Sequence, residues 1–124
     1  MIDKRFQKTR PVKLTVRTCR DVDVIDVQGV VLGTESRQLS AAVANSLAAN
    51  TRVVIVNLEK VAYFDEVTLE TLQLCHEQVT DYGGRFAIAL GQPRLCEWPR
   101  YWSCQMFLDE KDARENINGF YASW

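Results

Sequence analysis

Two carboxylates and a hydroxyl come together in the segment Asp65-Glu66-Val67-Thr68, where a helix is expected to begin. As the N-cap of that helix, Asp65 can accept the unpaired backbone amides of Val67 or Thr68, and its charge complements the positive end of the helix dipole. Glu66 stands in the first turn, where the same dipole favours acids. This junction therefore predicts a capped helix start with an exposed outer surface.

The elements that position this junction follow from the spacing of apolar residues. Val53 to Val56 form a β-branched run of the length expected for a strand buried on both faces. A short turn is expected after it, before Asp65. The helix then extends to about Tyr82, with apolar residues spaced by three and four positions along one face. That face is made by Leu69, Leu72, Cys75 or His76, and Val79.

The rest of the chain alternates between strands and helices. A hairpin of two strands, 12–18 and 22–28, comes first, with Arg20 and Asp21 in its turn. A helix is predicted next, from Thr34 or Glu35 to near Asn50. After the central strand and its helix, Gly83-Gly84 lead into a strand over 85–90, and a helix is expected within 92–101 that Pro99 shortens or breaks. The last elements are a strand over 105–108 and a final helix that is capped by Asp109 and contains Ala113 and Ile117. This order predicts an α/β fold, a mixed β-sheet of about four to five strands with helices packed against it.

The cysteines and the histidine predict neither a metal site nor a catalytic thiol. Cys19, Cys75, Cys96 and Cys104 lack the paired short spacing of a zinc site, and only Cys75 neighbours the single histidine, His76. Adjacency does not make Cys75 and His76 a catalytic pair, because neighbouring helix residues point about 100° apart. Cys75 lies on or near the apolar helix face and Cys19 at a strand end, so both are expected to be small buried hydrophobes.

The composition, with 47% hydrophobic and 25% charged residues among 124, is typical of one globular domain with a real core. No segment approaches the apolar length of a membrane helix, and residues 1–5 lack the apolar core of a signal peptide, so a cytoplasmic protein without membrane insertion is expected. The chain also lacks a Gly-rich phosphate loop and a Gly-x-Ser-x-Gly elbow, so no enzyme and no cofactor are predicted. Gly29 and Gly33 are interpreted as chain-turning residues.

The net charge is only −1, but basic and acidic residues are separated along the chain. Residues 1 to 20 hold seven basic residues and one acid, whereas residues 59 to 81 hold six acids and one lysine. In the strand 12–18, alternation places Lys13, Thr15 and Arg17 outward and Val12, Leu14 and Val16 inward. The basic segment lacks the dense run or interleaved aromatics of a nucleic-acid binder, so packing between copies or a solvated strand face is predicted instead.

The expected boundaries are a basic N-terminal arm over 1–11, one domain over 12–118 and an aromatic C-terminal tail over 119–124. The candidate contacts between copies are the arm and the tail, which holds Phe120, Tyr121 and Trp124. A charged edge such as the strand 12–18 either repels pairing or docks against an acidic neighbour. We therefore expect a homodimer or a larger assembly.

The register of the central segment is similar to that of the STAS domain, the family of sigma-factor and anti-sigma-factor antagonists. The match consists of a hydrophobic strand followed by Asn57-Leu58, Val61, Phe64, Asp65 and Leu69. Residues 24–29 (Val-Ile-Asp-Val-Gln-Gly) resemble an N-terminal strand of the family, and residues 82–89 (Tyr-Gly-Gly-Arg-Phe-Ala-Ile-Ala) resemble its turn into the next strand. The order and spacing of these motifs cover residues 12–118 and imply the STAS fold for this range.

The chain departs from the family pattern at its phosphorylation site. Asn57 stands where the family strand usually has Asp, and Glu66-Val67-Thr68 replaces the usual Ser-Ser-Gly. The acceptor serine of the sigma antagonists falls on Val67, which has no hydroxyl, and that of the stressosome-like branch falls on Glu66. Glu66, natural or engineered, is then either a permanent imitation of a phosphorylated side chain or only a favoured first-turn acid. Thr68 is the one nearby hydroxyl left for phosphorylation, and it is expected to point toward its own backbone or the neighbouring strand.

The resemblance implies a non-enzymatic regulatory module that acts in transcription by binding other proteins. It is either an anti-sigma-factor antagonist or a stressosome-type scaffold, and the implied partners are a kinase-type anti-sigma factor or other STAS proteins. The implied partner-binding region consists of Asp65, Glu66, Val67, Thr68 and Leu69. The alternative is an accessory STAS subunit of an anion or lipid transport system, because STAS-like modules also occur with such transporters.

Overall fold

The computed structural model describes residues 12–91 and 104–122, with their side chains up to Ile117. Its centre is a five-stranded sheet in the order β1-β2-β3-β4-β5. The strands are β1 (Lys13–Cys19), β2 (Val22–Val31), β3 (Val53–Phe64), β4 (Arg85–Ala89) and β5 (Gln105–Phe107). β1 pairs antiparallel with β2, and the other neighbouring strands pair in parallel, which confirms the predicted mixed sheet.

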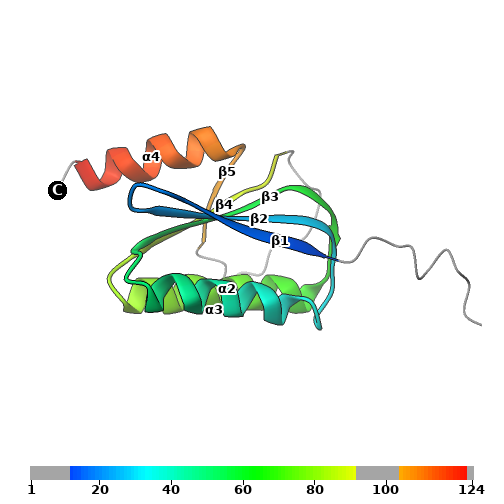
Figure 1. The fold of residues 1–124 in the computed structure, drawn as a ribbon. Coiled ribbons are helices and arrows are strands. Elements are labelled where there is room, and N and C mark those ends of the chain that lie inside the picture. Colours follow the sequence, from blue (N-terminus) through cyan, green and yellow to red (C-terminus); the bar gives the residue numbers. More distant parts are fainter. Residues whose placement is uncertain (1–11, 92–103, 123–124) are drawn as a thin grey trace, which may run out of the picture.

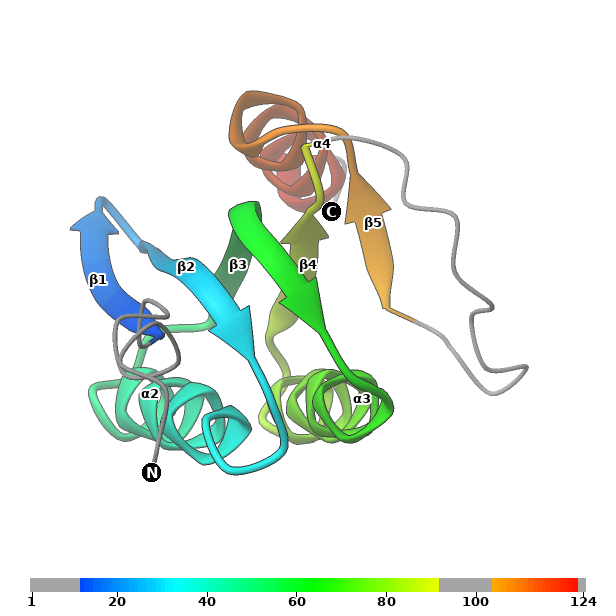
Figure 2. The same cartoon turned by 90° about the vertical axis from the view of Figure 1, so that its right-hand side faces the viewer.

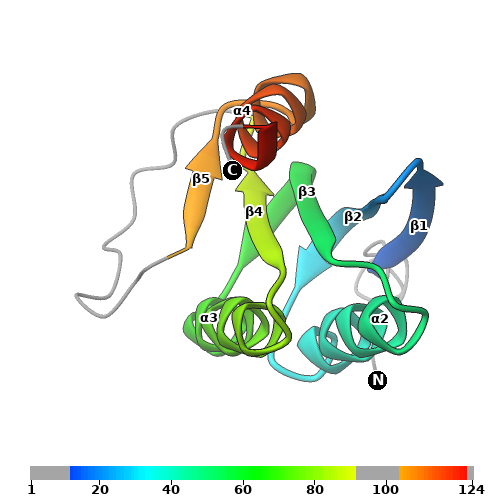
Figure 3. The same cartoon turned by 90° about the vertical axis from the view of Figure 1, so that its left-hand side faces the viewer.

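Helices cover both faces of the sheet. α2 (Ser36–Ala48) connects β2 to β3, and α3 (Glu66–Asp81) connects β3 to β4, so each helix is the crossover that a parallel pair requires. These two helices lie side by side on one face, and α4 (Glu110–Ala122) lies on the other (Figure 1). Figures 2 and 3 show the same three layers along the strands, from opposite sides.

The apolar core is divided by the sheet into two unequal parts. The large core lies between the sheet and the helices α2 and α3, and it includes Ile25, Val43, Val54, Leu72 and Phe86. The small core lies under α4 and consists of Val22, Val24, Val53, Ile55, Ala87, Ala113 and Ile117. Because Val54 and Ile55 are both 0% exposed and belong to different cores, the first half of β3 is buried on both faces, as predicted.

β3 is much longer than predicted, and the short turn expected before Asp65 is in fact strand. The pairing of β3 with β2 slips twice, and each time β3 holds one extra residue, which makes a β-bulge. The small core contains only residues from the first half of β3, whereas Glu59, Lys60 and Tyr63 of its second half are exposed. The run of residues buried on both faces therefore ends where the cover by α4 ends, although the strand continues.

β2 is longer too, because it continues past the predicted end at residue 28 to Val31. Gly29 lies inside this strand with φ 97, beside the second register slip, so its interpretation as a chain-turning residue is wrong. A positive φ at a bulge is a conformation that glycine adopts without steric cost. Gly33 does lie in the turn that leads from β2 to α2.

Two side chains of β1 that were expected inside are on the surface. Val16 is 46% exposed, and Cys19 is also exposed. β1 is an edge strand, and only its first part, including Leu14, packs against the large core. Cys75 and Cys104 are buried, and burial raises the pKa of each thiol to about 12. The prediction of a buried cysteine is therefore confirmed for Cys75 and wrong for Cys19.

The ends of the helices agree with the sequence signals. Glu35 precedes α2, Tyr82 follows α3, and Asp109 caps α4 by accepting the backbone amide of Asp112 at 2.8 Å. α4 continues to Ala122, past the domain boundary predicted at residue 118. The division into arm, domain and tail stays a prediction, and the predictions for residues 1–11 and 92–101 fall outside the described residues.

Candidate functional site

Asp65 joins three groups at the start of α3. Its Oδ1 atom accepts the backbone amide of Thr68 at 2.9 Å and lies 2.8 Å from the Thr68 hydroxyl. Its Oδ2 atom accepts the backbone amide of Gly33 at 2.9 Å. The predicted N-cap is thus confirmed, with Thr68 as the amide donor. The contact with Gly33 was not predicted, because it joins residues far apart in the sequence.

The Gly33 contact fixes the loop between β2 and α2 against α3. A Cβ atom on Gly33 would lie only 3.1 Å from Cγ1 of Val67, so the absence of a side chain lets the two segments approach. Ser36 donates its hydroxyl to the Gly33 carbonyl at 2.6 Å, and its Oγ lies 3.1 Å from Oγ1 of Thr71. The loop and the first two turns of α3 therefore form one connected surface.

The charge of Asp65 is stabilised by these contacts. Burial acts to raise the pKa of Asp65, but the bonds from the Thr68 amide, the Thr68 hydroxyl and the Gly33 amide outweigh it and lower this pKa below its ordinary value. An anionic Asp65 also complements the positive end of α3. The carboxylate consequently holds the start of α3 and the loop before α2 together through these contacts.

The five residues of the predicted binding region divide into inner and outer groups. Thr68 and Leu69 are buried, at 0% and 6% exposure, and Oγ1 of Thr68 also lies 3.1 Å from the Val31 carbonyl oxygen. Asp65 is half-buried. Glu66 is exposed, and Val67 is 48% exposed. Of the five, Glu66 and Val67 are therefore the residues with exposed side chains.

Sequence reasoning missed two apolar side chains at the same end of the sheet. Leu32, in the loop that Asp65 holds, is 42% exposed, and Tyr63, near the end of β3, is 56% exposed. Exposed apolar residues at one end of a sheet are typical of protein contact surfaces. Leu32 and Tyr63 lie close in the sequence to Gly33 and Asp65, and this proximity was the signal that could have identified them. Using it requires the end of β2 to be placed correctly.

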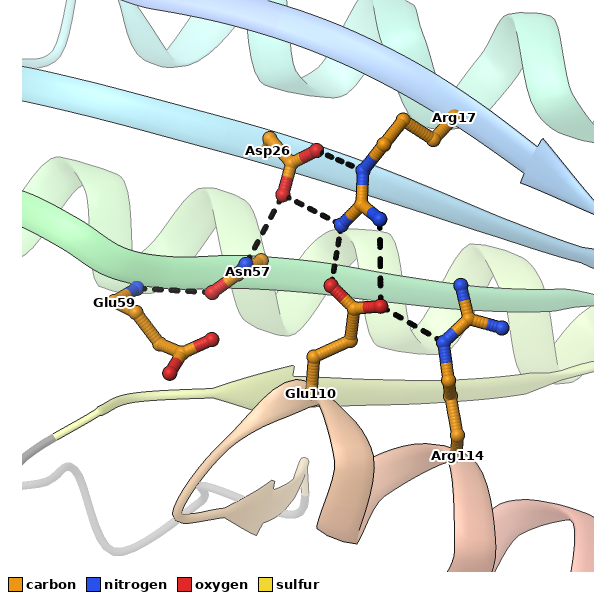
Figure 4. A network of polar contacts seen from close by, with 6 residues as sticks. All are labelled: Arg17, Asp26, Asn57, Glu59, Glu110 and Arg114. Atoms are coloured by element: carbon orange, nitrogen blue, oxygen red, sulfur yellow. Dashed lines mark hydrogen bonds and ion pairs between the residues drawn. The ribbon is translucent and has the colours of Figure 1, made fainter.

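A second polar network lies on the face of the sheet that carries α4 (Figure 4). Arg17 of β1 forms ion pairs with Asp26 of β2 and with Glu110 at the start of α4, and Arg114 donates Nε to Glu110 at 2.8 Å. Arg17 was predicted to face outward, on a strand edge that either repels pairing or docks against an acidic neighbour. The acidic neighbours are in the same chain, so Arg17 fastens the hairpin to α4.

The charges of this network reinforce one another. The Arg17 guanidinium lowers the pKa of Asp26 against the opposing effect of burial, with help from the Asn57 amide. Burial acts to raise the pKa of Glu110, but Arg17 and Arg114 outweigh it and lower this pKa. The two carboxylates in turn raise the pKa of Arg17. All three groups are therefore charged at neutral pH.

Asn57, the residue that replaces the family's aspartate, has a defined role beside this network. Its amide nitrogen donates to Oδ1 of Asp26 at 3.0 Å, and its Oδ1 accepts the backbone amide of Glu59 at 3.1 Å. A carboxylate at this position would face the Asp26 carboxylate. The neutral side chain thus fits its neighbour, and its second bond satisfies the backbone at the first bulge of β3.

The described residues hold no group of three or more His, Cys, Asp or Glu side chains arranged to bind a metal ion. Among the helices in the described part of the chain, none has the length and apolar character needed to cross a membrane.

The comparisons with known proteins find a match in three-dimensional structure. No protein-family sequence model and no curated protein sequence matches the chain. The anti-sigma factor antagonist SpoIIAA in its unphosphorylated form matches with a TM-score of 0.66 and 17% identity, over 88% of this chain and 99% of SpoIIAA. An anti-sigma factor antagonist from Mycobacterium paratuberculosis matches with a TM-score of 0.72 and 17% identity, over 87% of this chain and 95% of the other.

A third solved structure, a serine-to-glutamate variant of RsbS from Moorella thermoacetica, has a TM-score of 0.72 at 8% identity, over 89% of this chain and 98% of RsbS. The alignments span nearly the whole of each protein while most residue types differ. This combination confirms the architecture that the sequence resemblance implied. The chain therefore has the fold of the anti-sigma factor antagonists, the STAS fold.

Proposed function

We propose that this chain is a regulatory protein-interaction module of the STAS type, acting as an anti-sigma-factor antagonist or a stressosome-type scaffold. Its contact surface is the start of α3 and the loop held against it, called here the α3-start surface and consisting of Leu32, Tyr63, Glu66 and Val67. The observation that carries the proposal is the Asp65 carboxylate, which binds Gly33 and Thr68 and so fixes both halves of this surface. The proposed partner is a kinase-type anti-sigma factor or another STAS protein.

A fixed surface favours binding without a preceding rearrangement. Leu32 and Val67 stand on two different segments, and each is more than two-fifths exposed. Because Asp65 and the close contact between Gly33 and Val67 hold these segments together, little conformational entropy is lost when a partner covers them. The apolar centre with an acidic side chain beside it fits a partner whose contact patch is apolar and bordered by basic groups.

The proposal includes a binding state that phosphorylation does not switch. SpoIIAA has been solved in an unphosphorylated and in a phosphorylated form. In this chain Val67 offers no hydroxyl, and the Thr68 side chain is 0% exposed with its hydroxyl between Asp65 and the Val31 carbonyl. A kinase would have to open the helix start to reach Thr68, and the added phosphate would meet the Asp65 carboxylate.

Intact-mass measurement of the protein purified from its native cell tests this part of the proposal. The expected result is the unmodified mass in growing and in stressed cells. A stoichiometric phosphate mapped to Thr68 would show instead that the switch has moved by one residue.

Leucine variants test the contact surface. The partner is first isolated by pull-down from the native cell and identified by mass spectrometry, and its affinity for the purified chain is then measured by calorimetry. Leu32→Ser should weaken binding at least ten-fold, because an exposed apolar contact is lost. Leu108→Ser is the matched control, since Leu108 is 55% exposed and lies beyond β5, next to α4. Equal affinities of the two variants, or capture of transporter subunits alone, would contradict the proposal.

Glu66 needs its own pair of variants, because two interpretations of this residue remain open. If its carboxylate imitates phosphate, Glu66→Gln should change the partner affinity several-fold, while Glu70→Gln, an exposed acid one turn further along α3, should not. If Glu66 is only a favoured first-turn acid, both variants should bind like the original chain and Glu66→Gln should slightly lower the melting temperature.

Self-association is part of the proposal as a scaffold. The N-terminal arm and the C-terminal tail are the proposed contacts between copies. Light scattering at high protein concentration and low salt should report a homodimer or a larger species, and a monomer under these conditions would remove this part of the proposal.

A further inference from the structure

A large cleft lies at the end of the sheet opposite to Asp65. It is lined by the turn between β1 and β2, by the segment that enters β3 and by α4, and its volume is about 980 Å³. Figure 1 places that turn and the start of α3 at opposite ends of the molecule. Cavities of this size are typical of small-molecule sites. The cleft is therefore separate from the α3-start surface.

The charged side chains that line this cleft are mostly basic. Arg20, Arg52 and Arg114 line it together with one acid, Asp21. We call it the arginine cleft. The Glu110 carboxylate, which Arg114 contacts, offsets part of the charge of the three guanidinium groups, as does Asp21. The excess that remains is positive, so the cleft attracts an anion. Guanidinium groups match the geometry of phosphate oxygens, which they bind through two parallel hydrogen bonds.

Within the described part of the chain, two of these arginines are each held in place by one contact, and their other donors have no partner there. Arg52 donates Nη1 to the Tyr82 carbonyl at 3.0 Å, and Arg114 donates Nε to Glu110 at 2.8 Å. In Figure 4 the two terminal nitrogens of Arg114 lie on the side away from Glu110. An arginine that is anchored through one nitrogen loses less side-chain entropy when its remaining nitrogens bind a ligand. The two anchored arginines are thus pre-organised donors.

Arg20 is unusual in its backbone. It is the first residue of the two-residue turn between Cys19 and Val22, and its φ is 59. Glycine is preferred in such a position, because a side chain is strained at positive φ. The guanidinium of Arg20 has no hydrogen bond or ion pair with any other described residue, so no contact within that part of the chain accounts for an arginine here. Backbone strain at the edge of a cavity is a feature of binding sites.

We propose that the arginine cleft binds a small soluble anion that bears two or more phosphate charges, with Arg20, Arg52 and Arg114 as its ligands. The three side chains come from a turn, a strand entry and a helix, so they approach an anion from different directions. This arrangement suits tetrahedral phosphate groups better than a single planar carboxylate.

Inorganic pyrophosphate is the probe, and its binding to the full chain is measured by calorimetry at low salt. Arg20→Gly should weaken binding at least ten-fold, while the melting temperature stays equal or rises because glycine relieves the strained φ. Arg37→Gln is the control, since Arg37 is an exposed residue of α2 outside the cleft, and it also removes one positive charge. Wild-type affinity in Arg20→Gly, or an equal loss in both variants, would overturn the proposal.

The thiol of Cys19 gives a local and independent measurement. Cys19 lines the cleft and is exposed, whereas Cys75 and Cys104 are buried. Pyrophosphate should slow the alkylation of Cys19 several-fold, as followed by peptide mapping, and inorganic phosphate should do so less. An unchanged rate of Cys19 alkylation would place any bound anion elsewhere. Equal protection by citrate would show that the cleft does not select phosphate.

Discussion

Asp65, at the start of α3, and Asp26 of β2 are two aspartates whose pKa values are both lowered, and they are stabilised in different ways. Asp65 accepts two backbone amides and a hydroxyl, and no cation contacts it among the described residues. Asp26 instead accepts the side chains of Arg17 and Asn57, and Arg17 also contacts Glu110 of α4. The first arrangement depends on backbone position, and the second depends on the charge of movable side chains.

This difference predicts which network tolerates change. Backbone amides stay in place when salt is added or a neighbouring side chain is replaced, so the Asp65 contacts should be strong and less sensitive to ionic strength than the ion pairs of Asp26. The side chain of Arg17 is 49% exposed, and exposed ion pairs contribute little because water and salt screen them. The start of α3 should therefore be the more rigid of the two regions, as a fixed contact surface requires.

The largest expected effect is that of Asp65→Ala. It removes the cap of α3 and leaves the Gly33 amide without its acceptor, so the free energy of unfolding should fall by about 2–3 kcal/mol, as measured by urea denaturation. Asp109→Ala is the control, because Asp109 caps α4 through the one amide of Asp112, and it should cost about 1 kcal/mol. Equal losses for both variants would show that the Gly33 contact contributes nothing.

Asn57→Asp is the next largest change, and it tests the second network. It would place a carboxylate beside Oδ1 of Asp26, at a site where the amide nitrogen now lies 3.0 Å away. Two neighbouring carboxylates repel, so the variant should lose about 1–2 kcal/mol at pH 7 and raise the pKa of the pair. Since a raised carboxyl pKa means easier protonation in the folded state, much of this loss should disappear near pH 4.5. Loss of the same size at both pH values would contradict this explanation.

The two networks also differ in how far the sequence predicted them. The Asp65 cap is local: the capping residue and its amide donor are three positions apart, at the boundary between an apolar run and a helical repeat. The sheet order and the three layers follow similarly from the alternation of strands and helices. Local spacing was sufficient for these features.

The missed features depend on contacts between distant segments. The Arg17 and Glu110 ion pair joins residues 93 positions apart, and the Gly33 and Asp65 contact joins residues 32 positions apart. The second half of β3 was missed because α4 does not cover it, so its exposed residues resembled a turn. The apolar pattern of a strand reflects which of its faces are covered by helices. These faces are known only after the helices have been placed.

The acid response separates the contributions of the two aspartates. Both pKa values are lowered from an ordinary value of 3.8, so their stabilisation is present above that value and is lost as the pH falls through the folded-state pKa. The free energy of unfolding should therefore decrease as the pH falls below about 5. Asp65→Asn and Asp26→Asn should each flatten this decrease, because amides do not titrate in this range. An unchanged acid dependence in either variant would mean that its aspartate is not stabilised by folding.

The smallest expected effect is that of Arg17→Met, which keeps most of the aliphatic stem and removes the charge. Glu110 retains Arg114 and Asp26 retains Asn57, so the loss should be only about 0.5–1 kcal/mol at low salt. In 1 M salt, where charges are screened over about 3 Å, the variant and the original chain should become nearly equal in stability. The loss in Asp65→Ala should change much less between the two salt concentrations, because most of it comes from hydrogen bonds to backbone amides. Two results would contradict this explanation: a loss in Arg17→Met as large as that in Asp65→Ala, or a loss in Arg17→Met that is the same at low salt and in 1 M salt. Either would mean that packing of the arginine side chain, rather than its charge, fastens the hairpin to α4.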